Sequence, residues 1–424
     1  MTSQSKLARL TGWSLLAFAF AIPWSSALYR LSIFALLVCC IVFLTTDLKK
    51  IYSGKAEFSI SKASHYVPII FPWILTAWIM LTGFWTTGTS DLYGFDVSRY
   101  IKLLMIPIFA LLIARFYGGR QTEIINAFAC GVIVLMIPSY LDFLGVFRLL
   151  GIDAVKLGNH SYQAATERGL NLVYWRNQIV HGFHVSFLFS LVLLTLPEQG
   201  WRRYLHWLLA IACVFDVIFL ITGRMALVSL LASGATLIFI AVPSRRARVQ
   251  LAAAIFIASI IIIALNSGVQ TRIMSVWIEF TEYLIHANIQ TSSGSRLHYW
   301  SISLDLFQQH PIIGAGAGSF REWLLTHRDP LSKQSHFHAH NEYITQLSQF
   351  GLIGFGLFLF MIKYILKALR ACSDQRVRGS ILVAVVIFCV NALSDSSLHN
   401  EWEGWTLVLF SGLAGSYLFD QSKV

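Results

Sequence analysis

Apolar stretches long enough to cross a lipid bilayer recur along almost the whole of this 424-residue sequence. A helix needs about 20 mainly apolar residues to cross the ~30 Å hydrocarbon core. Backbone N–H and C=O groups cannot stay unpaired in lipid, so each such stretch must form a helix or part of a closed barrel. The stretches are continuous and do not alternate with period two, which favours helices. The sequence therefore predicts an all-α polytopic membrane protein.

The composition supports this fold class. Only 12% of the residues are charged, 56% are hydrophobic and the mean hydropathy is +0.65, whereas about 25% of an average soluble protein is charged. We expect a single transmembrane domain over residues 1–424 with about twelve transmembrane helices. The predicted spans are residues 10–25, 27–46, 66–86, 99–117, 123–145, 179–197, 203–222, 224–243, 249–266, 341–369, 379–394 and 404–420.

The positions of Lys and Arg predict the orientation of these spans. If both termini are cytoplasmic, nineteen of the 32 basic residues fall in segments on the cytoplasmic side, most of them in short loops. That bias is typical of inner loops in membrane proteins. The net charge of +11 is then mainly a topology signal, and we expect no nucleic-acid partner. We expect the protein to contact membrane lipids instead.

One long polar loop, residues 267–340, separates predicted spans 9 and 10 and lies on the non-cytoplasmic side. It holds seven of the thirteen histidines. Residues 276–289 and 297–309 show apolar positions at helical spacing, and a short helix is expected near residues 319–327. We therefore predict a helical loop subdomain with amphipathic helices that lie against headgroups or cap the bundle.

The end of this loop offers candidate proton acceptors. His338 and His340 precede Asn341 at the start of the tenth span, and neutral histidine is the usual general base near pH 7. A polar helix start with Asn341 as its cap is the structural alternative. A metal site built from His336, His338 and His340 is another. Alternating residues of an extended chain point to opposite sides, however, so we predict no metal.

Three arginines on the same side of the membrane are candidate anion ligands. Arg224 follows a very short outer turn, where a basic residue runs against the usual bias. Its planar guanidinium suits phosphate, and a salt bridge to Asp216 or a snorkelling side chain are the structural alternatives. Arg296 lies at a predicted helix start, where backbone N–H groups favour an anion. Arg176 lies at the mouth of the sixth span.

A combination of short motifs resembles a known family. The polar loop carries Ser-Gly-Ser-Arg-x₃-Trp over residues 293–300 and His-Pro-Ile-Ile-Gly-x-Gly over residues 310–316. His-Asn-Glu-x-Ile follows at residues 340–344, leading into Phe-Gly-Leu-Ile-Gly at 350–354, and Thr-Gly-Arg precedes the loop at 222–224. This order resembles the O-antigen ligase and polymerase superfamily of bacterial inner-membrane glycosyltransferases, most strongly over residues 180–400.

The resemblance implies an enzyme of lipopolysaccharide biosynthesis with a periplasmic active site. Its donor would be O-antigen on undecaprenyl pyrophosphate, and its acceptor a sugar hydroxyl of lipid A–core. His340 would be the base, with His338 as the alternative, and Arg224 and Arg296 would bind the pyrophosphate. Arg176 matches no family motif and is predicted from its position alone.

The expected reaction is a metal-independent inverting displacement without a cofactor. An O-antigen polymerase of the same superfamily is the alternative within the class. A transporter of an anionic lipid or solute is the alternative from another class, although no internal repeat supports it.

Overall fold

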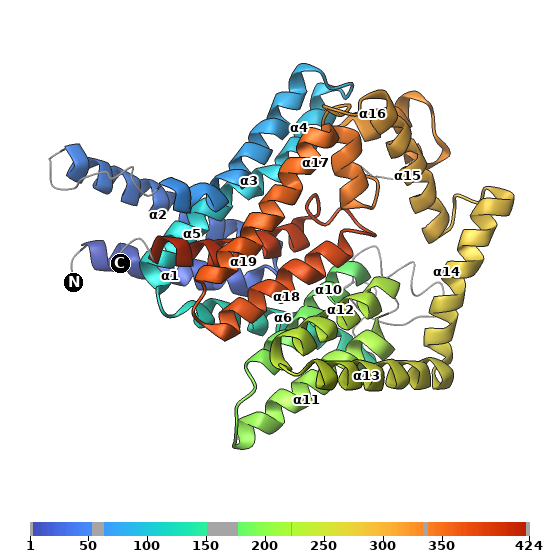
Figure 1. Cartoon of the computed structure of the whole chain (residues 1–424), viewed down its shortest axis with the longest axis horizontal. Helices are drawn as coiled ribbons and strands as arrows, with labels where there is room; N and C mark the ends of the chain where they lie inside the picture. The colour runs from blue at the N-terminus through green and yellow to red at the C-terminus, as the bar shows by residue number, and fades with distance from the viewer. Residues whose placement is uncertain (1–2, 53–62, 151–176, 222, 334–337, 421–424) are drawn as a thin grey trace.

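The computed structural model describes residues 3–52, 63–150, 177–221, 223–333 and 338–420, and its described residues form helices and connections without strands (Figure 1). The all-α fold predicted from the sequence is confirmed. The α-helices, in chain order, are α1 (Ser3–Ala21), α2 (Ser26–Tyr52), α3 (Ala63–Leu81), α4 (Ser90–Tyr100), α5 (Met105–Tyr117), α6 (Gln121–Phe143), α7 (Val146–Leu149), α10 (Gln178–Leu194), α11 (Trp201–Phe215), α12 (Arg224–Ala241), α13 (Arg245–Leu265), α14 (Ser267–His286), α15 (Ser292–Gln309), α16 (Ser319–Thr326), α17 (Glu342–Ala368), α18 (Gln375–Asn391) and α19 (Glu401–Asp420).

Seven helical stretches in the described part of the chain are long and apolar enough to cross a membrane. They are Ser26–Phe43, Ser90–Tyr117, Gln121–Phe143, Trp201–Leu220, Arg224–Ala241, Arg245–Leu265 and Glu342–Ala371. Three shorter apolar helices are Leu7–Ala21, Ile70–Phe84 and Gln178–Leu194. The chain is therefore a membrane protein, but the predicted count of twelve spans is not confirmed.

Helix α19, which contains the predicted span 404–420, lies at the centre of the bundle (Figure 1). Nearly all of its residues from Glu403 to Tyr417 are buried by other helices. A Cβ on Gly412 would lie only 2.6 Å from Phe109 Cβ on α5, so the small residue allows close approach of the two helices. Such small-residue contacts are typical of helix packing in membranes. Helix α19 is thus surrounded by other helices, and α5 is its main packing partner.

Helix α17 is interrupted at Gly351, whose φ of 68° is outside the helical region. A break leaves backbone groups without helical partners, and these must be paired elsewhere. The N–H groups of Leu352 and Ile353 donate to Pro311 O and Ile312 O at 2.9 and 3.2 Å. The broken helix is therefore completed by the glycine-rich segment of the polar loop.

The same segment returns hydrogen bonds to the other side of the break. The N–H groups of Ala315 and Gly316 donate to Ser348 O and Gln349 O at 2.9 and 2.8 Å. Two of the motifs noted in the sequence, at residues 310–316 and 350–354, are thus one backbone unit.

The polar loop forms helices α14, α15 and α16, which stand beside the bundle at the right and top of Figure 1. All three were predicted, although α14 begins nine residues earlier than the expected residue 276, at Ser267. Helices α15 and α16 contribute Tyr299, Phe320 and Leu324 to a second hydrophobic cluster. The division of the chain into a bundle and a loop subdomain over residues 267–340 stays a prediction.

Candidate functional site

The start of α17 is fixed by Asn341, the residue after His340. The Asn341 side chain caps the helix by accepting from Ile344 N at 3.1 Å, and its Nδ2 donates to Leu393 O at 2.9 Å. Glu342 N donates to Ala392 O at 2.8 Å. These bonds place His340 beside the connection between α18 and α19.

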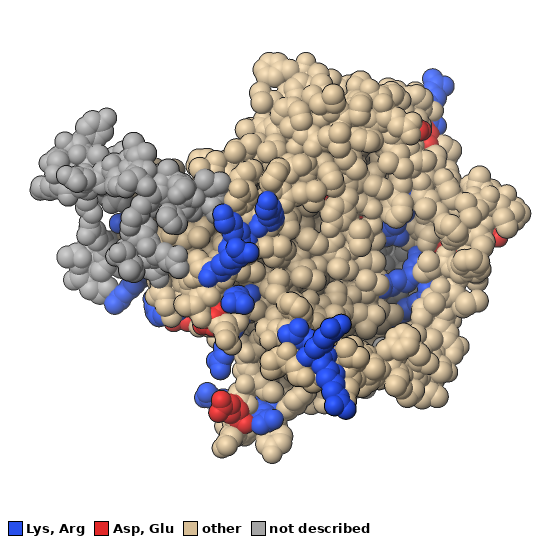
Figure 2. Space-filling model, viewed as in Figure 1, with Lys and Arg blue, Asp and Glu red and all other residues tan. Residues whose placement is uncertain are grey.

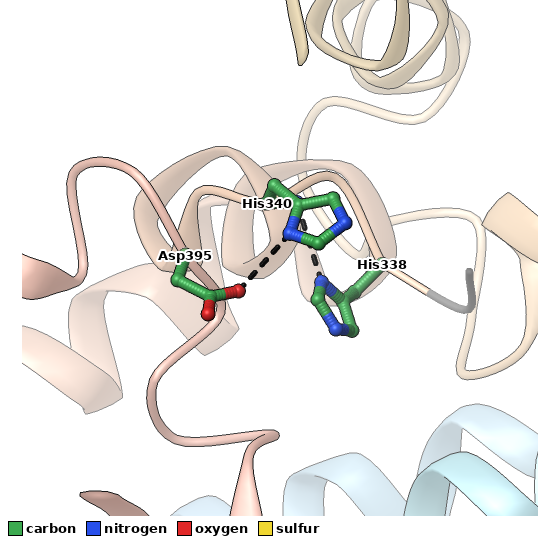
Figure 3. A group of neighbouring side chains, drawn as sticks. All are labelled: His338, His340 and Asp395. Atoms are coloured by element: carbon green, nitrogen blue, oxygen red, sulfur yellow. Dashed lines mark hydrogen bonds and ion pairs between the residues drawn. The ribbon is translucent and has the colours of Figure 1, made fainter. Parts of the chain in front are cut away.

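His340 and Asp395 form a hydrogen-bonded pair across this contact (Figure 3). His340 Nδ1 lies 3.1 Å from Asp395 Oδ1, and the two side chains are 18% and 4% exposed. An ionised carboxylate can only accept, so Nδ1 carries the proton and Nε2 keeps a lone pair. His340 has φ 52°, in the left-handed region, and its ring stacks on Tyr299 with centroids 6.0 Å apart. The neutral ring can therefore act as a base through Nε2.

Asp395 is held by its own network. Its oxygens accept from Ser396 N and Asn400 Nδ2, both at 2.9 Å. The carbonyl of Asn400 in turn accepts from Lys102 Nζ at 2.5 Å. Burial acts to raise the pKa of Asp395, but the hydrogen bond from His340, the attraction to His340 and His338 when these imidazoles are protonated, and the charge of Arg296 hold that pKa well below its ordinary value. Asp395 is therefore ionised and can stabilise a protonated imidazole.

His338 lies on the other side of His340 (Figure 3). Its Nδ1 accepts from His340 N at 3.3 Å, and the two ring centroids are 4.6 Å apart. The His338 ring is also 4.9 Å from the ring of His399, which pairs with the buried Asp96 at 2.9 Å. Both histidines predicted as bases thus lie in one cluster, in which the hydrogen bond between His340 and Asp395 orients the His340 ring.

Arg296 connects the polar loop to this cluster. From the first part of α15 its Nε donates to Ser394 O at 3.2 Å, directly before Asp395 in the sequence. Its Nη1 donates to Ser292 O and Oγ at 3.0 and 2.6 Å. Burial lowers the pKa of Arg296, and the charge of Asp395 opposes this effect while that of Arg224 adds to it. The two arginines and the His340–Asp395 pair therefore act within one electrostatic environment.

Arg224, at the start of α12, pairs with a residue of the polar loop. Its Nη2 lies 3.0 Å from Glu279 Oε2 on α14, and its Nη1 lies 3.4 Å from Ser275 Oγ. The alternative partner considered from the sequence, Asp216, instead bonds to His181 at 3.2 Å with both side chains fully buried. Arg224 is thus directed toward the loop helices and not into the bundle.

The loop helices and the bundle enclose a hollow that contains several basic side chains (Figure 2). Arg272 on α14 also faces the bundle, because its Nη2 donates to Ile218 O at 3.0 Å. That carbonyl belongs to a π-helical turn, Asp216–Leu220, at the end of α11. Positive charge in a partly enclosed site favours an anion such as a phosphate.

Two of the residues considered from the sequence lie outside the described part of the chain, Arg176 and His336. The predicted role of Arg176 in binding pyrophosphate stays a prediction. Another loop histidine, His298, bonds to Asp329 at 2.7 Å and holds the loop's own fold.

The cluster also contains a set of possible metal ligands. His338, His340 and Asp395 each offer one ligand atom, and these atoms lie within 4.8 Å of one another. Two imidazoles and a carboxylate suit zinc. In the structure the same atoms bond to protein groups, His340 Nδ1 to Asp395 and His338 Nδ1 to His340 N. The absence of a metal from the reaction stays a prediction.

Sequence reasoning missed two residues of this site, Asp395 and Glu279. Asp395 lies in a short polar connection with Ser, His and Asn neighbours between two apolar stretches, on the side of the membrane predicted for the polar loop. Intramembrane or near-membrane carboxylates usually have a basic partner, and that rule could have pointed to it. Glu279 lies on the polar face of an amphipathic helix, where nothing in the pattern distinguishes it.

Comparison with protein families finds a match for part of the chain. Residues 209–359 match the family described as O-antigen ligase. The matched part begins in α11, ends in α17, and includes Arg224, Arg296 and His340, whereas Asp395 lies beyond it. A search of curated proteins found no match. The resemblance noted in the sequence is therefore supported over residues 209–359, which are similar to the O-antigen ligase family of membrane proteins.

Proposed function

We propose that this protein is an O-antigen ligase. It transfers O-antigen from undecaprenyl pyrophosphate to a sugar hydroxyl of lipid A–core at the periplasmic face of the bacterial inner membrane. The observation that carries the proposal is the His340–Asp395 pair at 3.1 Å, with Arg296 bonded to the residue next to Asp395. A base and a cationic group therefore lie side by side, as transfer from a pyrophosphate requires.

In the proposed reaction the acceptor hydroxyl attacks the anomeric carbon of the donor. Its oxygen forms the new glycosidic bond while the bond from that carbon to the pyrophosphate oxygen breaks, and the hydroxyl proton passes to His340 Nε2. Undecaprenyl pyrophosphate leaves with the bonding electrons. Single displacement from the opposite face inverts the anomeric configuration. The leaving group is already activated, so no nucleotide is required.

His340, Asp395 and the arginines each contribute to this step. His340 accepts the proton, and Asp395 holds the ring in the correct tautomer and stabilises the imidazolium that forms. Arg224 and Arg296 oppose the negative charge that develops on the pyrophosphate, a contribution that is greatest in a partly enclosed site. Binding by Arg176 is part of the proposal on the basis of its sequence position.

The test is reconstitution of the purified protein in lipid with a defined donor and acceptor. We expect a new glycan–lipid product, loss of product in His340→Ala, and near-normal product in His286→Asn, a control at the exposed end of α14. If His338→Ala abolished activity and His340→Ala kept it, the assignment of the base would be wrong. Movement of substrate without bond formation would indicate a transporter.

Deletion of the gene distinguishes ligase from polymerase. A ligase predicts loss of capped lipopolysaccharide while long polymer accumulates on undecaprenyl pyrophosphate. A single repeat on the core would instead indicate a polymerase.

A further inference from the structure

Glu279 is a carboxylate of the polar loop that takes no part in the proposed reaction. It lies on α14, and its Oε2 accepts both from Arg224 Nη2 at 3.0 Å and from Ser293 N at 2.8 Å. Its side chain is 19% exposed and that of Arg224 is 24% exposed. Burial opposes ionisation, but the hydrogen bonds from Ser293 and Arg224 lower the pKa of Glu279 below its ordinary value. One charged oxygen therefore joins the bundle to the start of α15.

The N-terminus of α15 already binds an anionic side chain, that of Glu279. Thr291 Oγ1 accepts from Gly294 N at 3.0 Å, and Glu279 accepts from Ser293 N. Free N–H groups in the first turn of a helix attract anions, and the sequence led us to expect a substrate anion there. Glu279 occupies the position in which we expected a substrate anion. We therefore infer that α15 contacts the substrate through the Arg296 side chain.

Glu279 also relieves repulsion between the two arginines. Arg224 is close enough to Arg296 for its positive charge to lower the Arg296 pKa, and Glu279 acts in the opposite direction. A guanidinium has five N–H donors. Arg224 Nη2 donates to Glu279 Oε2 at 3.0 Å, and Arg224 Nη1 donates to Ser275 Oγ at 3.4 Å. The bond to Glu279 thus fixes the guanidinium without using all of its donors.

We propose that Glu279 is a positioning residue for the donor pyrophosphate. It holds Arg224 of the bundle and the Arg296-bearing start of α15 at a fixed separation before the donor binds. The proposal rests on the proposed function, in which these two arginines bind pyrophosphate. Arginines held in place before binding lose less conformational freedom when the donor arrives. The contribution of Glu279 should therefore appear in donor binding.

The test compares Glu279→Gln and Glu279→Ala with Glu282→Gln in the reconstituted transferase. Glu282 lies on the same helix and makes no side-chain hydrogen bond to any residue that the structure describes. Because hydrogen bonds to charged groups are the stronger ones, we expect Glu279→Ala to raise the donor KM by about tenfold or more. We expect kcat and the acceptor KM to change far less, and Glu282→Gln to match the wild type.

Glu279→Gln keeps the side-chain shape and an acceptor for Ser293 N, so it tests the charge if the alanine variant does not fold. We expect it to raise the donor KM as well, and Glu279→Asp to recover part of the loss. A melting temperature for each variant separates this effect from general unfolding.

A double variant tests whether Glu279 acts through Arg224. If it does, Glu279→Ala should raise the donor KM less in an Arg224→Ala background than in the wild type. If the two substitutions instead multiplied their effects on the donor KM, they would act independently and the proposal would be overturned. A lower donor KM in Glu279→Gln would also overturn it, because Glu279 would then compete with the donor. If Arg224→Ala alone left the donor KM unchanged, the proposed function of Arg224 would itself be wrong.

Discussion

Asp395→Asn provides the sharpest test of the proposed chemistry. The substitution keeps the size of the side chain and removes its charge, so the hydrogen bonds from Ser396 and Asn400 at 2.9 Å need not all be lost. What it removes is the negative charge 3.1 Å from His340 Nδ1. In the proposed reaction this charge matters most when His340 is protonated, during bond formation.

The size of the effect follows from that distance. Opposite unit charges 3.1 Å apart attract by about 5 kcal/mol at an effective dielectric constant near 20. The His340 side chain is 18% exposed, and an asparagine oxygen can still accept a neutral hydrogen bond. Taking about half of the attraction as lost gives ~2.7 kcal/mol in the activation free energy, or about 100-fold in kcat.

The assay is steady-state transfer with defined donor and acceptor, with Asp305→Asn as a control at an exposed position on α15. We expect kcat to fall and both KM values to stay within a few-fold, because the charge acts in the transition state. Activity within threefold of the wild type would refute the role of Asp395. A change confined to the donor KM would move Asp395 from the chemistry to binding.

Three further predictions concern the metal, pH and the broken helix. Transfer should be unaffected by chelators, and loss of activity that one metal restores would show that His338, His340 and Asp395 hold an ion. The pKa of Asp395 is lowered on folding, so the ionised Asp395 should stabilise the folded protein by a constant amount near neutral pH. This contribution should be lost below pH ~4. The difference in melting temperature between wild type and Asp395→Asn should therefore shrink below pH ~4. Gly351→Ala should destabilise the protein by about 2 kcal/mol or more, since φ is positive and a Cβ would lie 2.3 Å from Ile312 O. Gly356→Ala on the same helix, with open space around it, should be close to neutral in the same thermal unfolding assay.

The helical class and three residues of the candidate site could be predicted because they depend on local signals, although the roles of these three residues stay predictions. Apolar length identifies membrane helices, and Arg224, Arg296 and His340 stand in recognisable motifs at helix starts. Their proximity could not be derived from spacing, because it depends on how α14 and α15 fold back onto the bundle. The partner of Arg224 shows this: Asp216 is near in sequence, yet Glu279 makes the contact.

Asp395 and α19 show a second limit. Asp395 lies 55 residues beyond His340, and only the packing of α17 against α18 and α19 brings the two together. Hydropathy identified residues 404–420 as apolar but could not distinguish lipid from protein as their surroundings. In the structure most of α19 is surrounded by other helices, which is a property of the whole bundle.

The interruption of α17 determines how this protein can be recombined with its relatives. The strand-like exchange of backbone hydrogen bonds between residues 311–316 and 348–353 makes these distant segments one structural unit. A chimera that imported the polar loop alone would join a new 311–316 segment to an unchanged helix, and its backbone would have to fit the break at Gly351 to keep these bonds. Transplants that include residues 341–353 with the loop keep both halves of that unit. The natural module for exchanging the polar loop therefore ends within α17, beyond Gly351.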